Sequence, residues 1–142
     1  MDTIERDAIL IALGKWVRQR PGLEFGNYGD ARSYSAEMRG IARDRRDAET
    51  LLRAVQWSSI SAEALREAFR AFSGRLSWDG ARLSYCTGQY WPTEYRKAAC
   101  AVLASALWRH RAADLSPDES ADKLRSRFRR EFGRGLAGRW FN

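Results

Sequence analysis

The segment from Tyr85 to Trp108, with the sequence YCTGQYWPTEYRKAACAVLASALW, constrains the fold of this chain more than any other. Pro92 suits the first position of a helix, where its missing amide would have had no partner, and Glu94 then lies in the first turn, where the helix dipole favours an anion. The helix predicted from Pro92 is rich in alanine, so neighbouring backbones can approach it closely. We therefore expect it to lie at the centre of the domain.

Four aromatic residues surround the start of this helix: Tyr85, Tyr90, Trp91 and Tyr95. Aromatic side chains in such a position favour core packing. The alternative is a platform on which unpaired bases stack, with Arg96 and Lys97 close to the phosphates.

Four further helices are predicted, over about residues 2–20, 31–56, 62–72 and 116–132. The second has apolar residues at alternating spacings of four and three, a heptad-like stripe that only Arg45 interrupts. Arg45 is expected either to lay its stem across the core or to form a paired charge. Whether this helix pairs with a second copy stays open. In the last helix, Ser116, Pro117 and Glu119 have the pattern of a capping box with proline at the first position.

After residue 72 the spacing of apolar residues changes from a helical period to the alternation of a strand. This change predicts a short β-hairpin over residues 75–86. Asp79 and Gly80 form the two-residue loop that matches the twist of antiparallel strands. In that register Leu76 faces Leu83 and Trp78 faces Ala81. The expected fold is therefore α+β and mainly α, a single domain over residues 1–142 with about five helices and this hairpin packed on them.

The chain has 142 residues and a formal net charge of +7, with a sequence pI of about 10.0. Such a balance suits a polyanion or an acidic protein surface. Nearly all of the basic residues are arginine, which binds phosphate and carboxylate in a bidentate manner, although a GC-rich genome would also favour arginine codons. The longest apolar run is too short to span a membrane and no signal peptide is evident, so we expect a cytoplasmic protein without membrane contact.

The basic excess is concentrated at the C-terminal end, residues 116–142. From Lys123 onwards there are seven basic residues against Glu131 alone. This segment is interpreted as a basic arm for nucleic acid, as a solvated helix face or as a surface for an acidic protein. Phe25 and Tyr28, in the glycine-rich loop over residues 20–30, and Trp140 near the terminus are expected aromatic anchors for a partner.

The sequence lacks a recognisable catalytic centre. His110 is the only histidine, and Cys86 and Cys100 do not have metal-ligand spacing. No phosphate-binding glycine loop is present. We expect neither catalytic residues nor a cofactor or metal, so the protein is expected not to be an enzyme. A carboxylate-only nuclease, for example with Asp79 and Glu94 on Mg²⁺, is the remaining enzymatic alternative.

The segments RPGLEFGNYGD, SYCTGQYWPTEYRKAACAVLASALW and FRREFGRGLAGRWFN resemble small proteins of phages and mobile genetic elements, of the anti-CRISPR type. This resemblance covers most of the chain and attaches no chemistry to particular residues. It implies a setting in which small single-domain proteins often inhibit host defence, while others regulate or bind DNA. Together with the absence of a visible reaction centre, it leads to the hypothesis of a non-catalytic inhibitor of a host nucleic-acid-targeting defence complex, with a host protein or nucleoprotein complex as its partner.

The first hypothesis is therefore inhibition through protein binding, with a CRISPR effector subunit as one candidate target. The alternative is a DNA- or RNA-binding protein that uses the basic C-terminal arm, and a metal-dependent nuclease is the weakest alternative. The expected partner-binding residues are aromatic or basic: Phe25, Tyr28, Arg96, Lys97, Arg125, Arg129, Arg130, Arg134 and Trp140.

Overall fold

The computed structural model describes residues 2–19, 31–71, 76–78, 83–85, 92–116 and 118–140. Its helices are α1 (Asp2–Arg18), α2 (Ala31–Gln56), α3 (Ala62–Ala71), α4 (Pro92–Ala113) and α5 (Ala121–Trp140). Side-chain surroundings are described for residues 2–19, 36, 38–71, 95–116 and 118–132. None of the described helices combines the length and the apolar composition needed to cross a membrane.

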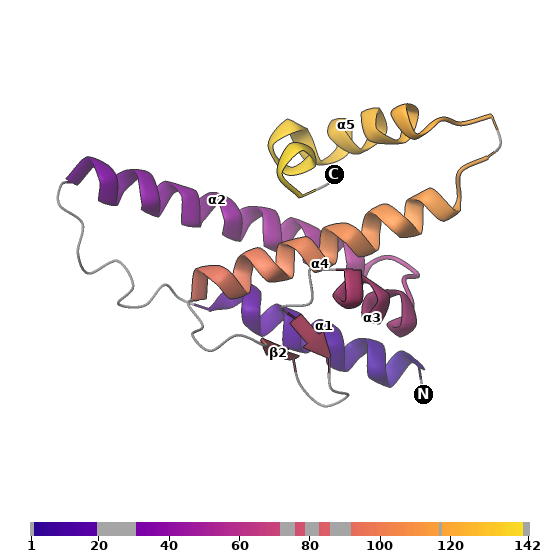
Figure 1. Ribbon diagram of the computed structural model, residues 1–142, viewed down its shortest axis with the longest axis horizontal. Coiled ribbons are helices and arrows are strands. Elements are labelled where there is room, and N and C mark those ends of the chain that lie inside the picture. The colour runs from indigo at the N-terminus through magenta and orange to yellow at the C-terminus, as the bar shows by residue number, and fades with distance from the viewer. Residues whose placement is uncertain are drawn as a thin grey trace.

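The alanine-rich helix α4 is the central element, as its sequence predicts, and it contacts each of the other four helices. In Figure 1 it lies between α5 on one side and α1 and α3 on the other. Ala98, Ala99 and Ala104 are buried along it, so neighbouring helices approach its backbone closely. Tyr95, whose ring centroid is 4.8 Å from that of Trp16 in α1, packs as a core aromatic.

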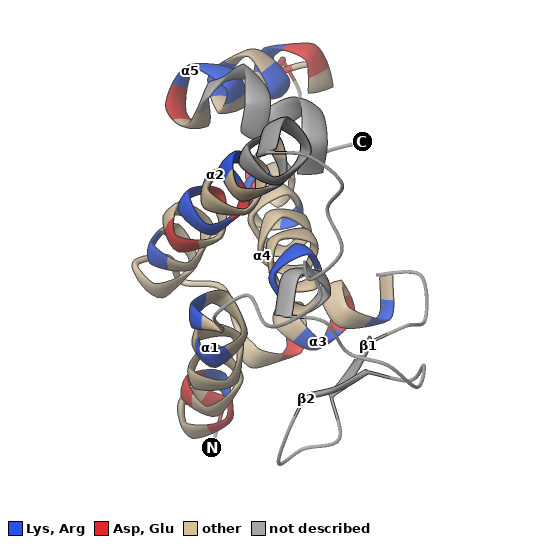
Figure 2. Cartoon of the chain, turned by 90° about the vertical axis from the view of Figure 1, so that its left-hand side faces the viewer, with Lys and Arg blue, Asp and Glu red and all other residues tan. Residues whose placement is uncertain are grey.

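The helix α2 makes its most extensive contact with α4. Its heptad-like stripe provides the contact surface, because Ile41, Ala48, Leu52 and Val55 are all buried. Helices α1 and α3 add further residues to the same core: Ile9, Leu13, Val17, Leu65 and Phe69. Charged residues of both signs occur along α1 and α2, most of them exposed, whereas α4 carries few charged residues (Figure 2).

The fold is all-α, and the expectation of an α+β fold with a packed hairpin is wrong. The helices contain between 10 and 26 residues. In the described part of the chain, β1 (Leu76–Trp78) and β2 (Leu83–Tyr85) contain three residues each and form a two-stranded ladder. Two strands of this length are too small to form a structural layer of their own, so the helices alone determine the fold class.

The register of this ladder also differs from the expected one. Trp78 pairs with Leu83 and Leu76 pairs with Tyr85, whereas the sequence predicted Ala81 and Leu83 as their partners. Residues 79–82 therefore separate the paired strands, instead of the Asp79–Gly80 pair alone. Strands of three residues offer few cross-strand pairs, so a favourable two-residue turn does not by itself set their register.

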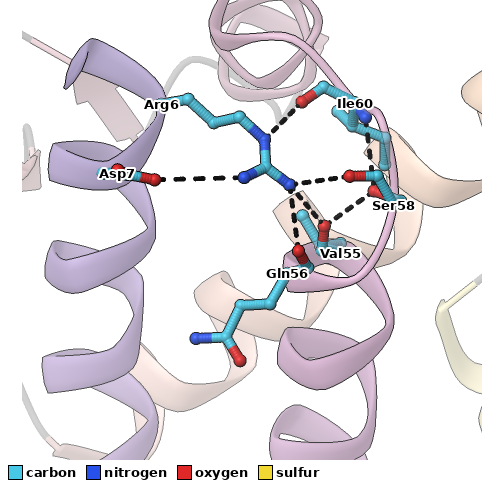
Figure 3. A network of polar contacts seen from close by, with 6 residues as sticks. All are labelled: Arg6, Asp7, Val55, Gln56, Ser58 and Ile60. Atoms are coloured by element: carbon cyan, nitrogen blue, oxygen red, sulfur yellow. Dashed lines mark hydrogen bonds and ion pairs between the residues drawn. The ribbon is translucent and has the colours of Figure 1, made fainter. Parts of the chain in front are cut away.

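An arginine of α1 binds the C-terminal end of α2 (Figure 3). Arg6 Nε donates to the carbonyl of Ile60 at 2.6 Å, and its Nη2 donates to those of Val55 at 2.8 Å and Ser58 at 2.9 Å. The last carbonyls of a helix have no partner within it and carry partial negative charge. The guanidinium therefore completes the helix end and ties α1 to the turn before α3.

The C-terminal end of α1 is held in the same way by arginines of α4 and α2. Arg96 donates from Nε to the carbonyl of Val17 at 3.2 Å and from Nη2 to that of Gln19. Arg45 Nη2 donates to the carbonyl of Arg18 at 3.2 Å. Arg45, the charged interruption of the apolar stripe, thus crosses to a neighbouring helix and caps it.

Candidate nucleic-acid interface

One face of α5 anchors it on α4. Leu124 and Phe128 are buried, with 4% and 0% of their surface exposed, and Phe132 is half-buried beside them. The ring of Phe128 lies 5.8 Å from that of Trp108 in α4 and 4.6 Å from that of Phe132. The spacing of four places these three residues on one face of the helix, so the rest of its circumference is available to solvent.

Arg111, in the last turn of α4, fixes how α5 is rotated. Its Nη1 lies 2.5 Å from Oε2 of Glu131 and its Nη2 lies 2.7 Å from Oε1, a bidentate ion pair. The same guanidinium carbon lies 4.9 Å from the ring centroid of Phe128 and 5.1 Å from that of Phe132. These contacts restrict rotation of α5 about its axis. They also pair Glu131, the one acidic residue from Lys123 onwards.

The start of α5 differs from the expected one. The hydroxyl of Ser120 accepts a hydrogen bond from the amide of Lys123 at 3.3 Å. The carbonyl of Ser120 accepts a hydrogen bond from the amide of Leu124 at 3.2 Å. Ser120 is therefore the N-cap, and the capping box predicted at Ser116 is wrong. The helix also continues to Trp140, past the predicted end at residue 132.

The outer surface of α5 carries a group of exposed cations: Lys123, Arg125, Arg129 and Arg130. None of these four forms an ion pair with a described residue. Figure 2 shows basic residues along the described part of this helix. Their charge is therefore directed to solvent or to a partner.

Two of these cations, Lys123 and Arg130, also belong to a basic stripe along α5. We define this basic stripe as Lys123, Arg127, Arg130 and Arg134. The successive spacings of four, three and four place these positions on one side of a helix. The first three line a shallow groove together with Glu119, Asp122 and Ser126. Arg127 is the exception to the unpaired charges, because its Nη2 contacts Oε2 of Glu119. The stripe extends over about 16 Å at the rise of an α-helix.

The structure distributes the expected partner-binding residues unevenly. Lys97, Arg125, Arg129 and Arg130 are exposed. Arg134 and Trp140 belong to α5 without described side-chain surroundings, and Phe25 and Tyr28 lie outside the described residues. Among the expected residues whose surroundings are described, Arg125, Arg129 and Arg130 are therefore all exposed on α5.

The expectation that Arg96 contacts a partner is wrong. Its side chain is fully buried, with 0% exposure, between α4 and the end of α1. Its guanidinium binds backbone carbonyls there, so it is not available to phosphates or to another protein.

The expected set also omitted residues that the structure exposes. Lys123 and Arg127 lie on the basic stripe, and Trp57 is 89% exposed directly after α2. The sequence contained a signal for each. The spacing of the C-terminal cations indicates the stripe, and Trp57 falls outside the apolar stripe that ends at Val55.

The described residues contain one candidate nucleophile near the histidine. Ser59 Oγ lies 3.4 Å from Nε2 of His110, and no described residue forms a hydrogen bond with the other ring nitrogen. Among the described residues no group of three or more His, Cys, Asp and Glu could hold a metal ion. Of the suggested nuclease pair, Asp79 lies outside the described residues and the surroundings of Glu94 are not described.

No protein-family model, curated protein or solved structure matches this chain.

Proposed function

We propose that this protein is a non-catalytic nucleic-acid-binding protein that contacts phosphates through α5. The observation that carries the proposal is the group of four exposed cations, Lys123, Arg125, Arg129 and Arg130, without ion pairs to described residues. Four other arginines, Arg6, Arg45, Arg96 and Arg111, stabilise helix ends or hold α5 on α4. The four cations of α5 do neither, and a phosphate backbone would give each of them a counter-charge.

The position of α5 supports the proposal as well. The helix is attached to α4 along one face, and a helix exposed on its other faces can enter the major groove, which is about 12 Å wide. Each strand of duplex DNA carries one phosphate for about every 3.4 Å of the axis, so the 16 Å basic stripe has the length of roughly five phosphates on one strand. Contacts of this kind give affinity and orientation, not sequence specificity. We expect such a protein to act in the cytoplasm, on host or element nucleic acid.

The first prediction concerns binding of nucleic acid by α5. We expect the protein to bind a labelled DNA duplex with an affinity that falls steeply as salt rises, measured by fluorescence anisotropy at several salt concentrations. Replacing Lys123, Arg125, Arg129 and Arg130 with glutamine should lower the affinity about tenfold or more. It should reduce the slope of log K against log salt by roughly three to four, because about one counterion is released for each phosphate contact.

A control variant with the same loss of charge distinguishes a specific role of the α5 cations from an effect of the net charge alone. Arg39, Arg46, Arg53 and Arg109 are exposed cations on α2 and α4, and their replacement with glutamine should change the affinity much less. An equal loss in both variants would contradict a specific role of α5, as would absence of binding at low salt. Parallel titrations with single-stranded DNA and duplex RNA identify the preferred nucleic acid.

Inhibition of a host nucleic-acid-targeting defence complex, of the anti-CRISPR type, is the second candidate function. One observation favours a protein partner: Trp57 is 89% exposed, and tryptophan is enriched among the residues that dominate protein interfaces. An inhibitor of this kind would block target cleavage by such a complex without measurable affinity for free nucleic acid. The anisotropy titration therefore distinguishes the two candidates.

A further inference from the structure

The helix α1 has an apolar face in the core and a second apolar surface in solvent. Ile9, Leu13 and Val17 are fully buried. On the other side of the helix, Ile4 is 75% exposed and Ile11 is 61% exposed. Two large aliphatic side chains on the same side of a surface helix suggest a surface that a partner covers.

Charged residues accompany these isoleucines on the exposed side of α1. A groove there is lined by Arg6, Asp7, Leu10, Ile11, Lys15 and Arg18 and, from α2, by Gln56. The Asp7 carboxylate lies 4.0 Å from Nη1 of Arg6, yet its side chain remains 62% exposed. Lys15 and Arg18 are exposed and form no ion pair with a described residue.

The order of these residues is symmetric about Ile11. Positions 4, 7, 11, 15 and 18 are separated by three, four, four and three residues, so Asp7 and Lys15 lie equally far from Ile11 in opposite directions. Ile4 and Arg18 are related in the same way. A two-fold axis through Ile11 would therefore bring unlike groups together, as a self-complementary interface requires.

We propose that this face of α1 binds the same face of a second copy of the chain, with the two helices antiparallel. Ile11 then packs on the partner's Ile11 at the axis. Asp7 pairs with the partner's Lys15, and Lys15 pairs with the partner's Asp7. Ile4 covers the aliphatic stem of the partner's Arg18. Charge complementarity favours a second copy in this antiparallel orientation. A parallel pairing in register would instead place Asp7 opposite Asp7 and Lys15 opposite Lys15.

The contact area argues for a moderate affinity. α1 contains 17 residues, and a helix of that length extends over about 25 Å. One helix face of this length buries less area than a standard protein interface, so we expect dissociation in the micromolar range. The association is independent of α5 and goes beyond the proposed function.

Exchange of charges tests the pairing directly. In sedimentation-velocity experiments over a range of micromolar concentrations, the wild-type protein should change from monomer to dimer. Asp7→Lys and Lys15→Asp should each weaken the association at least tenfold, because each places like charges opposite one another at both positions. An equimolar mixture of the two variants should dimerise with about the wild-type affinity, since one then presents two lysines and the other two aspartates.

A control variant, Glu63→Lys, reverses an exposed charge on α3 and should dimerise as the wild type does. All the substituted positions are exposed or partly exposed, so circular dichroism should show folded variants. The proposal would be overturned by a monomeric wild type at every concentration, by variants that associate like the wild type, or by a mixture that remains monomeric.

Discussion

Arginine residues in this protein have two roles, and their side-chain surroundings distinguish them. Some donate hydrogen bonds to carbonyls at helix ends, and others are exposed on α5 without an ion pair to a described residue. Arg6 donates hydrogen bonds to carbonyls in the turn between α2 and α3, including a longer one to Gln56 at 3.3 Å. Arg96 and Arg45 do the same at the end of α1. A planar group with several donors in fixed directions suits such clusters of carbonyls, and a lysine ammonium does not reproduce the geometry.

The second prediction concerns Arg6. Replacement with methionine keeps much of the apolar stem but leaves the carbonyls of Val55, Ser58 and Ile60 without their donor. Hydrogen bonds from a charged donor contribute about 1.5–3 kcal/mol each at most, and water will reach part of this partly buried site, so we expect a loss of about 2–4 kcal/mol in the free energy of unfolding. Urea denaturation followed by circular dichroism measures this loss.

Two further variants make the Arg6 experiment decisive. Arg53→Met, an exposed substitution near the same end of α2, should stay within about 0.5 kcal/mol of the wild type. Arg6→Lys should recover less than half of the loss. If Arg6→Met were as stable as Arg53→Met, the carbonyl cluster would not depend on this side chain.

The role of Arg96 could not be predicted from the sequence. Its position beside Lys97, after a cluster of aromatic residues, suggested a phosphate contact. In the structure its acceptor Val17 is 79 positions away along the chain. Whether an arginine is exposed or caps a distant helix depends on tertiary packing, which local composition does not record.

At the scale of the elements, the helices with long periodic patterns were the most predictable. The stripe on α2 predicted its buried face, and the proline and alanine content of α4 predicted its start and its central position. The start of α5 was less predictable, because Pro117 favoured Ser116 as the N-cap whereas Ser120 caps the helix in the structure. The predicted α+β class was wrong because the turn signal at Asp79 and Gly80 was interpreted as evidence for a β-layer that packs on the helices.

The third prediction concerns attachment of α5. Phe128 is fully buried against Trp108, Phe132 and Arg111, and α5 makes its main contact with α4. Phe128→Ala removes the centre of that contact, a change that typically destabilises by about 3–5 kcal/mol. We expect α5 to detach while α1 to α4 stay folded, since these four helices pack on one another more extensively than α5 packs on α4.

Amide hydrogen exchange separates local detachment from global unfolding. In Phe128→Ala, amides of residues 121–132 should lose protection while those of α2 and α4 keep it. Phe69→Ala, which truncates a residue of the main core with 2% exposure, should reduce protection in all helices. Full protection of α5 in Phe128→Ala, or loss of protection throughout the protein, would contradict this account.

The whole molecule has a formal net charge of +7, and its folding concentrates four unpaired cations on α5. Like charges held close together repel, so these residues should contribute nothing to stability and should slightly oppose folding. Arg111 is different, because its guanidinium is bound by Glu131 and by two aromatic rings. Measurements of the free energy of unfolding can therefore distinguish cations that stabilise the folded protein from cations that are available to a partner.

The fourth prediction makes that separation. The variant with glutamine at Lys123, Arg125, Arg129 and Arg130 should unfold in urea with a free energy equal to or greater than that of the wild type, within about 0.5 kcal/mol on the lower side. Added salt should stabilise the wild type more than this variant, because salt screens the repulsion that the substitutions remove. Arg111→Gln, the control, should instead lose about 1–2 kcal/mol with the bidentate pair and the ring contacts. A loss above about 1 kcal/mol in the glutamine variant would show that the cations of α5 hold the fold, and the proposed binding role would then lose its structural basis.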